Sequence, residues 1–390
     1  MNWFETGEDT RLNDQIEHEC PEGSENRMNV FQHAEYDNHE RIVFCHDEAS
    51  GLNAIIAIHS TTLGPAAGGC RMWRYANDEE ALTDALRLSR GMSYKNAMAE
   101  IRFGGGKSVI IGDALRDKTA ELFRAFGRAV DQQSGDYITA EDVGVRVADM
   151  EEVATQTRFV SGLSQRGSSA GGDPSPWTAR GVFVGIGEAV AHHLGAESLQ
   201  GVRVAVQGLG GVGYHLCRHL HEAGAVLTVA DINAERANTA NDEFGAHVVN
   251  TEDIVGADVD VFAPCALGAV INARSVDELK ATVVAGAANN QLATPEDGER
   301  LRSANVLYVP DYVINAGGII SAEGEYYGDK SADDVAARVD AIGPRLRAIF
   351  LESSATNTGT HVIADALAES KIREGASKTS TPALVDKLAS

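Results

Sequence analysis

Val202-Arg-Val-Ala-Val-Gln-Gly-Leu-Gly-Gly-Val-Gly213 is the stretch that decides the fold of this chain. An apolar strand pattern runs into a GxGxxG motif, and a helical pattern follows it. The first glycine of such a motif, Gly208, allows a tight turn, and the second, Gly210, lets the backbone approach a pyrophosphate. The third, Gly213, lets the helix pack closely on the strand, with its positive N-terminus towards the anion. The stretch therefore predicts a Rossmann-type turn.

The next predicted strand indicates which dinucleotide this turn binds. It ends at Asp231, 18 residues after Gly213. A carboxylate there accepts hydrogen bonds from both hydroxyls of the adenosine ribose and repels a 2′-phosphate. No arginine follows it directly, so NAD is favoured over NADP. The residues expected to contact the cofactor in this region are Gln207, Gly208, Leu209, Gly210, Gly211, Val212, Gly213 and Asp231.

The chain around this motif alternates between buried strands and helices. After the motif, apolar strand runs lie at 226–230, 259–262, 282–285 and 306–309. That rhythm is typical of a parallel sheet covered by helices, so we expect an α/β fold with two domains around a cleft. The expected parts are a polar extension at 1–28, a substrate domain at 29–165 with a C-terminal return at 350–390, and a Rossmann domain at 166–349.

Patterning in the first half is also clear. Strands are predicted at 41–45, 52–59 and 136–140. A helix is predicted after Asn77, which caps it, and Glu80 completes a capping box. A further helix is expected at 120–130, and the stretch 161–176 is rich in Gly, Ser and Pro, as in a loop that crosses between domains.

Composition excludes several classes of function. The 390 residues include 33 basic and 57 acidic side chains, a net charge of −24 that repels nucleic acid and anionic membranes. No stretch approaches the ~20 apolar residues that span a bilayer, and the acidic start has no apolar signal-peptide run. The five cysteines form no CxxC pair, which disfavours a disulfide scaffold or a zinc site. We expect a cytoplasmic protein that acts on a small molecule and holds no metal.

Gly104-Gly-Gly-Lys107 is a second glycine-rich stretch, and its lysine is a candidate reactive group. It is not a Walker A phosphate loop, because Ile101 stands where that motif has its first glycine. Three glycines would let a substrate approach the bend closely. Burial and a second cation, Lys95, would favour a neutral amine at Lys107. A surface loop with two solvated lysines is the alternative.

Seven motifs in chain order resemble the amino-acid dehydrogenase superfamily, and within it the leucine, valine and phenylalanine dehydrogenases. The resemblance covers roughly residues 30–375. Its motifs are GPAAGGCRMW (64–73), GMSYKN (91–96), GGGK (104–107), TAEDVG (139–144), PCALG (264–268), GAANN (286–290) and NAGG (315–318).

The resemblance implies reversible oxidative deamination of an L-amino acid to a 2-oxo acid and ammonia, with NAD as hydride acceptor, by a homo-oligomer. In that family the lysine matching Lys95 binds the α-carboxylate, the lysine matching Lys107 activates water, and the aspartate matching Asp142 moves protons. Further contacts are implied for Gly68 and Gly69 to the substrate, Thr178 and Ala266 to the cofactor, and Asn289 to both.

Ala67, Ala140 and Val313 are expected to line the pocket for the substrate side chain. All three are small and apolar, so the distal carboxylate of glutamate would lie unpaired there, at a cost of several kcal/mol. Since one or two methylenes are worth only ~1–3 kcal/mol, these residues do not separate Leu, Val and Ile. Branched-chain substrates are expected. Phenylalanine is one alternative, and a catalytically silent NAD-binding sensor is another.

Overall fold

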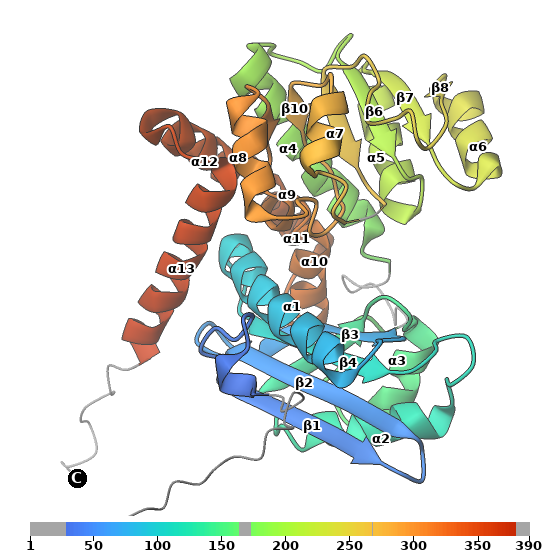
Figure 1. Ribbon diagram of the computed structural model, residues 1–390, viewed down its shortest axis with the longest axis vertical. Coiled ribbons are helices and arrows are strands. Elements are labelled where there is room, and N and C mark those ends of the chain that lie inside the picture. Colours follow the sequence, from blue (N-terminus) through green and yellow to red (C-terminus); the bar gives the residue numbers. More distant parts are fainter. Residues whose placement is uncertain (1–28, 164–172, 267, 380–390) are drawn as a thin grey trace, which may run out of the picture.

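The computed structural model describes residues 29–163, 173–266 and 268–379. Two sheets, each with its own helices, lie one above the other (Figure 1), as expected for the predicted α/β class. The lower sheet contains, in spatial order, β1 (Arg41–Asp47), β2 (Leu52–Ser60), β4 (Gly104–Ile111), β3 (Ala66–Trp73) and β5 (Tyr137–Glu141). The predicted extension at 1–28 and much of the predicted loop at 161–176 lie outside the described residues.

Alternation along the strands of the lower sheet places helices on both of its faces. From β2, Ile55 and Ala57 pack under α1 (Asp78–Ala99). Their neighbours Ile56 and Ile58 pack on the opposite face, which α2 (Ala120–Asp131) and α3 (Val147–Ala154) cover. Strand β3 runs parallel to both β4 and β5, so these three strands end at the same edge.

Helix α1 begins where the sequence predicts. The Asn77 side chain accepts a hydrogen bond from the Glu80 backbone N–H at 2.9 Å. The Glu80 carboxylate accepts from the N–H of Ala76 at 2.6 Å, one residue before the cap itself. The cap fixes the residue at which α1 begins, and Lys95 lies near the other end of the same helix.

The triple glycine is not the bend that the sequence predicts, because it forms the first part of β4. A Cβ on Gly104 would lie 2.0 Å from the carbonyl oxygen of Ser60, and one on Gly105 would lie 2.1 Å from the backbone N of Ser93 on α1. The three glycines therefore let β4 pack tightly against its neighbours. Sequence patterns treat glycine as a strand breaker, so β3 and β4 were both absent from the predicted elements.

The upper sheet is entirely parallel. Its strands, in spatial order, are β11 (Leu307–Tyr308), β10 (Val283–Val284), β9 (Val261–Pro264), β6 (Arg203–Gln207), β7 (Val226–Ala230) and β8 (His247–Val248). In chain order from β6 this is the 3-2-1-4-5-6 arrangement of the Rossmann fold. The GxGxxG turn therefore lies at the carboxyl end of β6, where the strand order reverses and dinucleotides bind. The two-residue β8 was not predicted.

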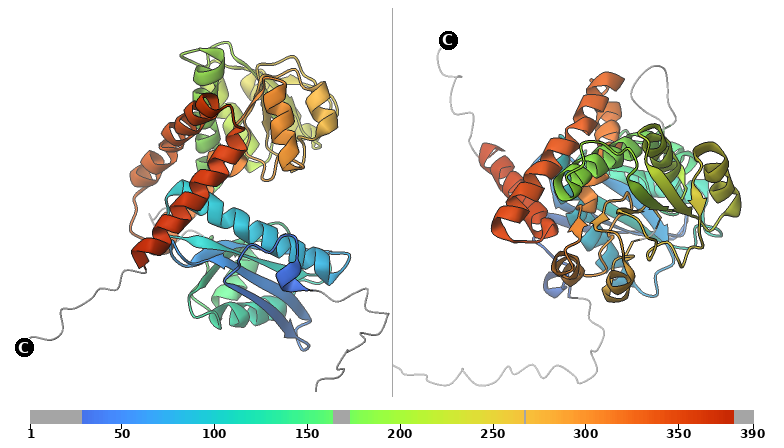
Figure 2. Two further views of the ribbon diagram at one scale, coloured as in Figure 1. Left: turned by 60° about the vertical axis from the view of Figure 1, so that its left-hand side comes forward. Right: turned by 90° about the horizontal axis from the view of Figure 1, so that it is seen from above.

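Helices cover both faces of the upper sheet and connect it to the lower one (Figures 1 and 2). The helices of this part are α4 (Ser175–Leu194), α5 (Gly211–Glu222), α6 (Ala234–Phe244), α7 (Ala273–Glu278), α8 (Pro295–Ser303), α9 (Asp311–Ile314), α10 (Gly317–Tyr327), α11 (Ala332–Asp340), α12 (Ile342–Thr356) and α13 (Thr360–Thr379). Helix α12 packs on α4, whereas α13 returns to lie beside α1. None of the helices within the described ranges is both long and apolar enough to cross a membrane.

Candidate active site

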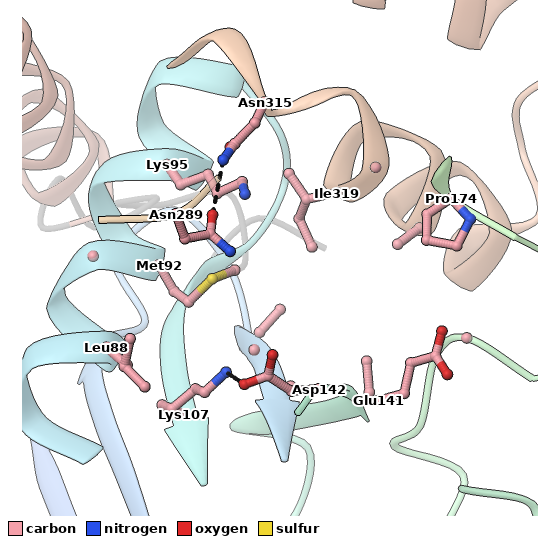
Figure 3. Close-up of a pocket in the computed structure, with 18 of the residues that line it drawn as sticks. Leu88, Met92, Lys95, Lys107, Glu141, Asp142, Pro174, Asn289, Asn315 and Ile319 are labelled. Atoms are coloured by element: carbon pink, nitrogen blue, oxygen red, sulfur yellow. Dashed lines mark hydrogen bonds and ion pairs between the residues drawn. The ribbon is translucent and has the colours of Figure 1, made fainter. Parts of the chain in front are cut away.

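A cavity of about 420 Å³ lies between the two halves of the molecule (Figure 3). Its lining comes from α1, β3, β4 and β5 on one side, and from α4, α5, α9, α10 and the loop after β10 on the other. The predicted site residues that line it are Ala67, Gly68, Gly69, Lys95, Lys107, Ala140, Asp142, Thr178, Val212 and Asn289. Residues from widely separated motifs thus meet at one cavity.

Lys107 and Asp142 form an ion pair at the floor of this cavity (Figure 3). Lys107 projects from β4, and Asp142 directly follows β5. The Lys107 side chain is only 7% exposed. Burial opposes ionisation of Asp142, but the charges of Lys107 and Arg71 outweigh it and lower the pKa of Asp142 to about 2. Lys107 and Asp142 thus form a largely buried pair.

Burial destabilises the charge of Lys95. This lysine projects from α1 into the same cavity. Burial lowers the pKa of Lys95 to about 8; the positive charge of Lys107 acts in the same direction, and Asp311 and Asp142 oppose it. An ammonium held at this cost gains from any anion that enters the cavity. Lys95 is therefore suited to bind a carboxylate.

Gly68 and Gly69 let β3 pass close to the neighbouring strand β4 and to Asp142. A Cβ on Gly68 would lie 1.8 Å from the carbonyl oxygen of Gly106. A Cβ on Gly69 would lie 2.5 Å from the carbonyl oxygen of Glu141 and 2.9 Å from the Cβ of Asp142. Any side chain at either position would therefore displace the neighbouring backbone, and β3 can pass this close only as glycine.

Val313 does not line the cavity, contrary to expectation. Its side chain is 1% exposed and belongs to the hydrophobic core. The reason lies in α9, where successive residues turn by about 100°. Asp311 and Asn315, four residues apart, face the cavity, so Val313 points the other way. The apolar residues that do line the cavity include Met92 and Ile319.

Asn289 is held in place by Asn315, which the sequence pattern does not assign to the site. The side-chain amide of Asn315 donates to Asn289 Oδ1 at 2.8 Å and to the carbonyl oxygen of Ala287 at 3.0 Å. Asn315 Oδ1 is buried and has no partner among the described residues. An unpaired acceptor beside the cavity is a position for a donor group of a ligand. Asn315 stands in the NAGG motif, which was the available signal.

The glycine turn fits a dinucleotide. Gly208 has φ +93°, and a Cβ on Gly213 would lie 1.9 Å from the carbonyl oxygen of Gly208. A Cβ on Gly210 would meet nothing within 4 Å, so the backbone there is open to a pyrophosphate. Asp231 accepts hydrogen bonds from the backbone N–H groups of Leu209 (2.6 Å) and Asn233 (2.7 Å). These two bonds hold its carboxylate at the turn, where an adenosine ribose binds.

The remaining predicted cofactor contacts surround this turn. Gln207 ends β6, Gly211 and Val212 begin α5, and Ala266 follows β9. The Oγ1 of Thr178 on α4 donates to the carbonyl oxygen of Pro174 at 3.1 Å. Within the described part of the chain, no group of three or more His, Cys, Asp or Glu side chains is placed to hold a metal ion. A Rossmann turn that faces a cavity with a buried lysine–aspartate pair defines a pyridine-nucleotide dehydrogenase.

Comparisons with known proteins identify the family. The model of the Glu/Leu/Phe/Val dehydrogenase dimerisation domain matches residues 39–159, and that of Glutamate/Leucine/Phenylalanine/Valine dehydrogenase matches 173–235 and 228–377. Over 345 residues the chain is 50% identical to leucine dehydrogenase of Geobacillus stearothermophilus, covering 88% of this chain and 94% of that one. It is 44% identical to valine dehydrogenase of Streptomyces virginiae over 350 residues, 89% and 97% of the two chains. The chain belongs to the Glu/Leu/Phe/Val dehydrogenase family of amino-acid dehydrogenases.

A solved structure agrees with this assignment. The crystal structure of L-tryptophan dehydrogenase from Nostoc punctiforme superposes with a TM-score of 0.76 at 44% identity, covering 87% of this chain and 97% of that one. The superfamily resemblance seen in the sequence is thus confirmed. Relatives of similar identity are named for leucine, valine and tryptophan, so the family alone does not decide the side chain.

Proposed function

We propose that this protein catalyses the NAD-dependent, reversible oxidative deamination of branched-chain L-amino acids to 2-oxo acids and ammonia. The observation that carries the proposal is the buried pair of Lys107 and Asp142, in one cavity with a second lysine, Lys95. The leucine and valine dehydrogenases among the relatives support a branched side chain. Glu141 and Glu325 also line the cavity and would repel the distal carboxylate of glutamate.

Each of these side chains has a role that its chemistry allows. Lys95 binds the α-carboxylate of the substrate. Asp142 takes a proton from the substrate ammonium, because hydride leaves Cα only from the neutral amine. Bound NAD supplies the hydride acceptor. Lys107 then removes a proton from the water that attacks the iminium carbon. Asp142 returns its proton to the amine and takes the hydroxyl proton of the carbinolamine as ammonia leaves and the 2-oxo acid forms. The products are the 2-oxo acid, ammonium, reduced cofactor and one proton, which Lys107 releases.

The arrangement also supports a division of labour between two domains. In this proposal residues 29–165, with the return from 350, bind the amino acid and build a homo-oligomer, as the dimerisation-domain match favours. Residues 166–349 hold NAD. Closure of the cavity between them would exclude water before hydride transfer. Gly68 and Gly69, Ala67 and Ala140 would border the substrate, and Asn289 and Thr178 the nicotinamide.

Replacement of Asp231 tests the assignment of NAD. In Asp231→Ala the adenosine ribose loses its acceptor, and a hydrogen bond to a charged group is worth roughly 1.5–3 kcal/mol. We therefore expect NAD to bind about tenfold more weakly or worse, and the preference for NAD over NADP to fall, in calorimetric titrations with both cofactors.

Asp231→Asn is the matched variant, because it removes the charge but keeps the shape and one acceptor. Asp231→Asn should bind NAD more tightly than Asp231→Ala does, and the two variants should bind NADP with similar affinity. If both variants keep the selectivity of the wild-type protein, the ribose is recognised elsewhere.

The pKa of Lys95 predicts how substrate binding depends on pH. Because the pKa of Lys95 is lowered to about 8, its ammonium is lost as the pH rises through that value. The dissociation constant of a branched 2-oxo acid, which has no titrating amine, should be flat below pH 8. Above it, the constant should rise about tenfold per pH unit. Calorimetry with NADH present and ammonium absent measures this.

Lys95→Met supplies the control for that titration. It should bind the 2-oxo acid weakly and without the break near pH 8. A break that persists in this variant would assign the titration to another group.

A panel of twenty L-amino acids, each with NAD, decides the side chain. We expect leucine, valine and isoleucine to give the highest kcat/KM. A clear preference for phenylalanine would favour the alternative substrate class. Binding of NAD without turnover of any amino acid would leave the silent sensor as the function.

A further inference from the structure

Arg71 lies beside the proposed catalytic pair and is not part of it. In the parallel pairing of β3 with β5, Cys70 is opposite Glu141, so the next residues, Arg71 and Asp142, lie side by side. The Nε of Arg71 donates to Asp142 Oδ2 at 3.3 Å, the same oxygen that Lys107 contacts. One carboxylate oxygen is thus shared by two cations.

The other end of the Arg71 guanidinium is fixed to α1. Its Nη1 donates to Asp84 Oδ2 at 2.8 Å, and that oxygen also accepts from the Tyr75 hydroxyl at 2.8 Å. Only 22% of the Arg71 side chain and 12% of the Asp84 side chain are exposed. Eleven residues, about three helical turns, separate Asp84 from Lys95, so both lie on the same face of α1. Arg71 therefore joins the carboxylate of Asp142 to the helix that carries Lys95.

The two cations on Asp142 differ in one property. In the proposed reaction Lys107 gains and loses a proton, so its charge changes during each turnover. A guanidinium keeps its proton under all these conditions. When Lys107 is neutral, Arg71 is the positive charge that stays next to Asp142.

We propose that Arg71 is a positioning residue for the deamination, which holds the carboxylate of Asp142 ionised and oriented while Lys107 changes its charge. Asp84 and Tyr75 fix Arg71 in turn. This inference rests on the proposed function. Arg71 lines the cavity, and the role inferred for it is exerted through Asp142.

Arg71→Gln is the direct test. Loss of the permanent cation makes the Lys107–Asp142 pair hold its proton more tightly. We expect kcat for L-leucine to fall at least about tenfold, within the range for proton-transfer groups, and the KM for NAD to change less than about twofold. The midpoint of the pH profile of kcat/KM should move up by about one unit. Arg71→Lys, which keeps the charge, should restore the midpoint but not the full kcat.

A double-mutant cycle separates this role from a merely structural one. If Arg71 acts through Asp142, then adding Arg71→Gln to the Asp142→Asn variant should lower kcat by less than about a further twofold. Asp84→Asn, which leaves Arg71 in place but loosens it, should move the midpoint in the same direction by less. Arg124→Gln is the control. Arg124, on α2, also pairs with two carboxylates, those of Glu121 on α2 and Glu152 on α3, but it does not line the cavity. Its loss should leave kcat and the profile unchanged.

The outcomes distinguish the two proposals. If the wild-type protein is active and its Arg71→Gln and Asp84→Asn variants keep the wild-type pH profile, only the positioning role is overturned. The same holds if Arg71→Gln lowers kcat by its full factor in the Asp142→Asn variant. A wild-type protein that deaminates no amino acid overturns the proposed function and this inference together.

Discussion

Lys107→Ala should lower turnover of L-leucine by about 10³-fold or more. The residue is the one proposed base for water, and proton-transfer groups contribute about 10²–10⁴-fold to rates. The dissociation constant for NAD should change less than about twofold, because the glycine turn and Asp231 lie in the other half of the molecule. Steady-state rates at saturating substrate, together with calorimetric titration of NAD, measure both quantities.

Lys118 provides the matched control. It too is a partly buried lysine of the lower half, ion-paired with Asp149 at 2.5 Å, but it does not line the cavity. Lys118→Ala should therefore turn over within about twofold of the wild-type protein. Turnover by Lys107→Ala at the rate of this control would remove Lys107 from the mechanism.

Glu323→Ala should destabilise the protein by about 3 kcal/mol. Glu323, on α10, has a side chain that is 1% exposed. It accepts from Arg102 Nε at 2.6 Å and also pairs with Arg338. Removal of one partner of a buried ion pair costs about 3–5 kcal/mol, because charge is left uncompensated. The lower end applies, since both arginines reach water and Arg102 keeps Asp329. Urea unfolding at fixed protein concentration measures the loss.

Glu278→Ala is the comparison for this variant. Glu278 pairs with Arg274 on α7, but its side chain is 43% exposed and that of Arg274 is 86% exposed. Exposed pairs contribute about 0–1 kcal/mol, so its unfolding midpoint should stay close to that of the wild-type protein. Equal losses in the two variants would mean that burial of Glu323 carries no special weight.

The upper half was largely predictable because its determinants are local. The glycine turn and the carboxylate of Asp231 are related by a short strand–helix–strand unit, so their spacing alone defines their geometry. Continuous apolar runs, separated by helical segments, predicted five of the six strands of the upper sheet. In the lower half, Asn77 likewise marked the start of α1. Interactions within one unit of secondary structure can be seen in a single sequence.

The rest depended on tertiary packing. Residues 104–106 form a strand and not a turn because of the groups that pack against them, which include Ser60 and α1. No local sequence pattern reveals those contacts. The sequence predicts Val313 in the pocket, although the rotation of α9 turns it into the core. The contact of Arg71 with Asp142 follows from the register of β3 on β5. Distant pairings of this kind require the folded structure.

The central claim is that the cavity between the two halves deaminates an amino acid with NAD as the oxidant. The most direct test is to incubate the protein with L-leucine and NAD and to measure two products in the same reaction: reduced nicotinamide, by its absorbance, and ammonia, by a separate assay. The account predicts that NADH and ammonia appear together in equal amounts. NADH without ammonia, or neither product with any amino acid although NAD binds, would contradict it.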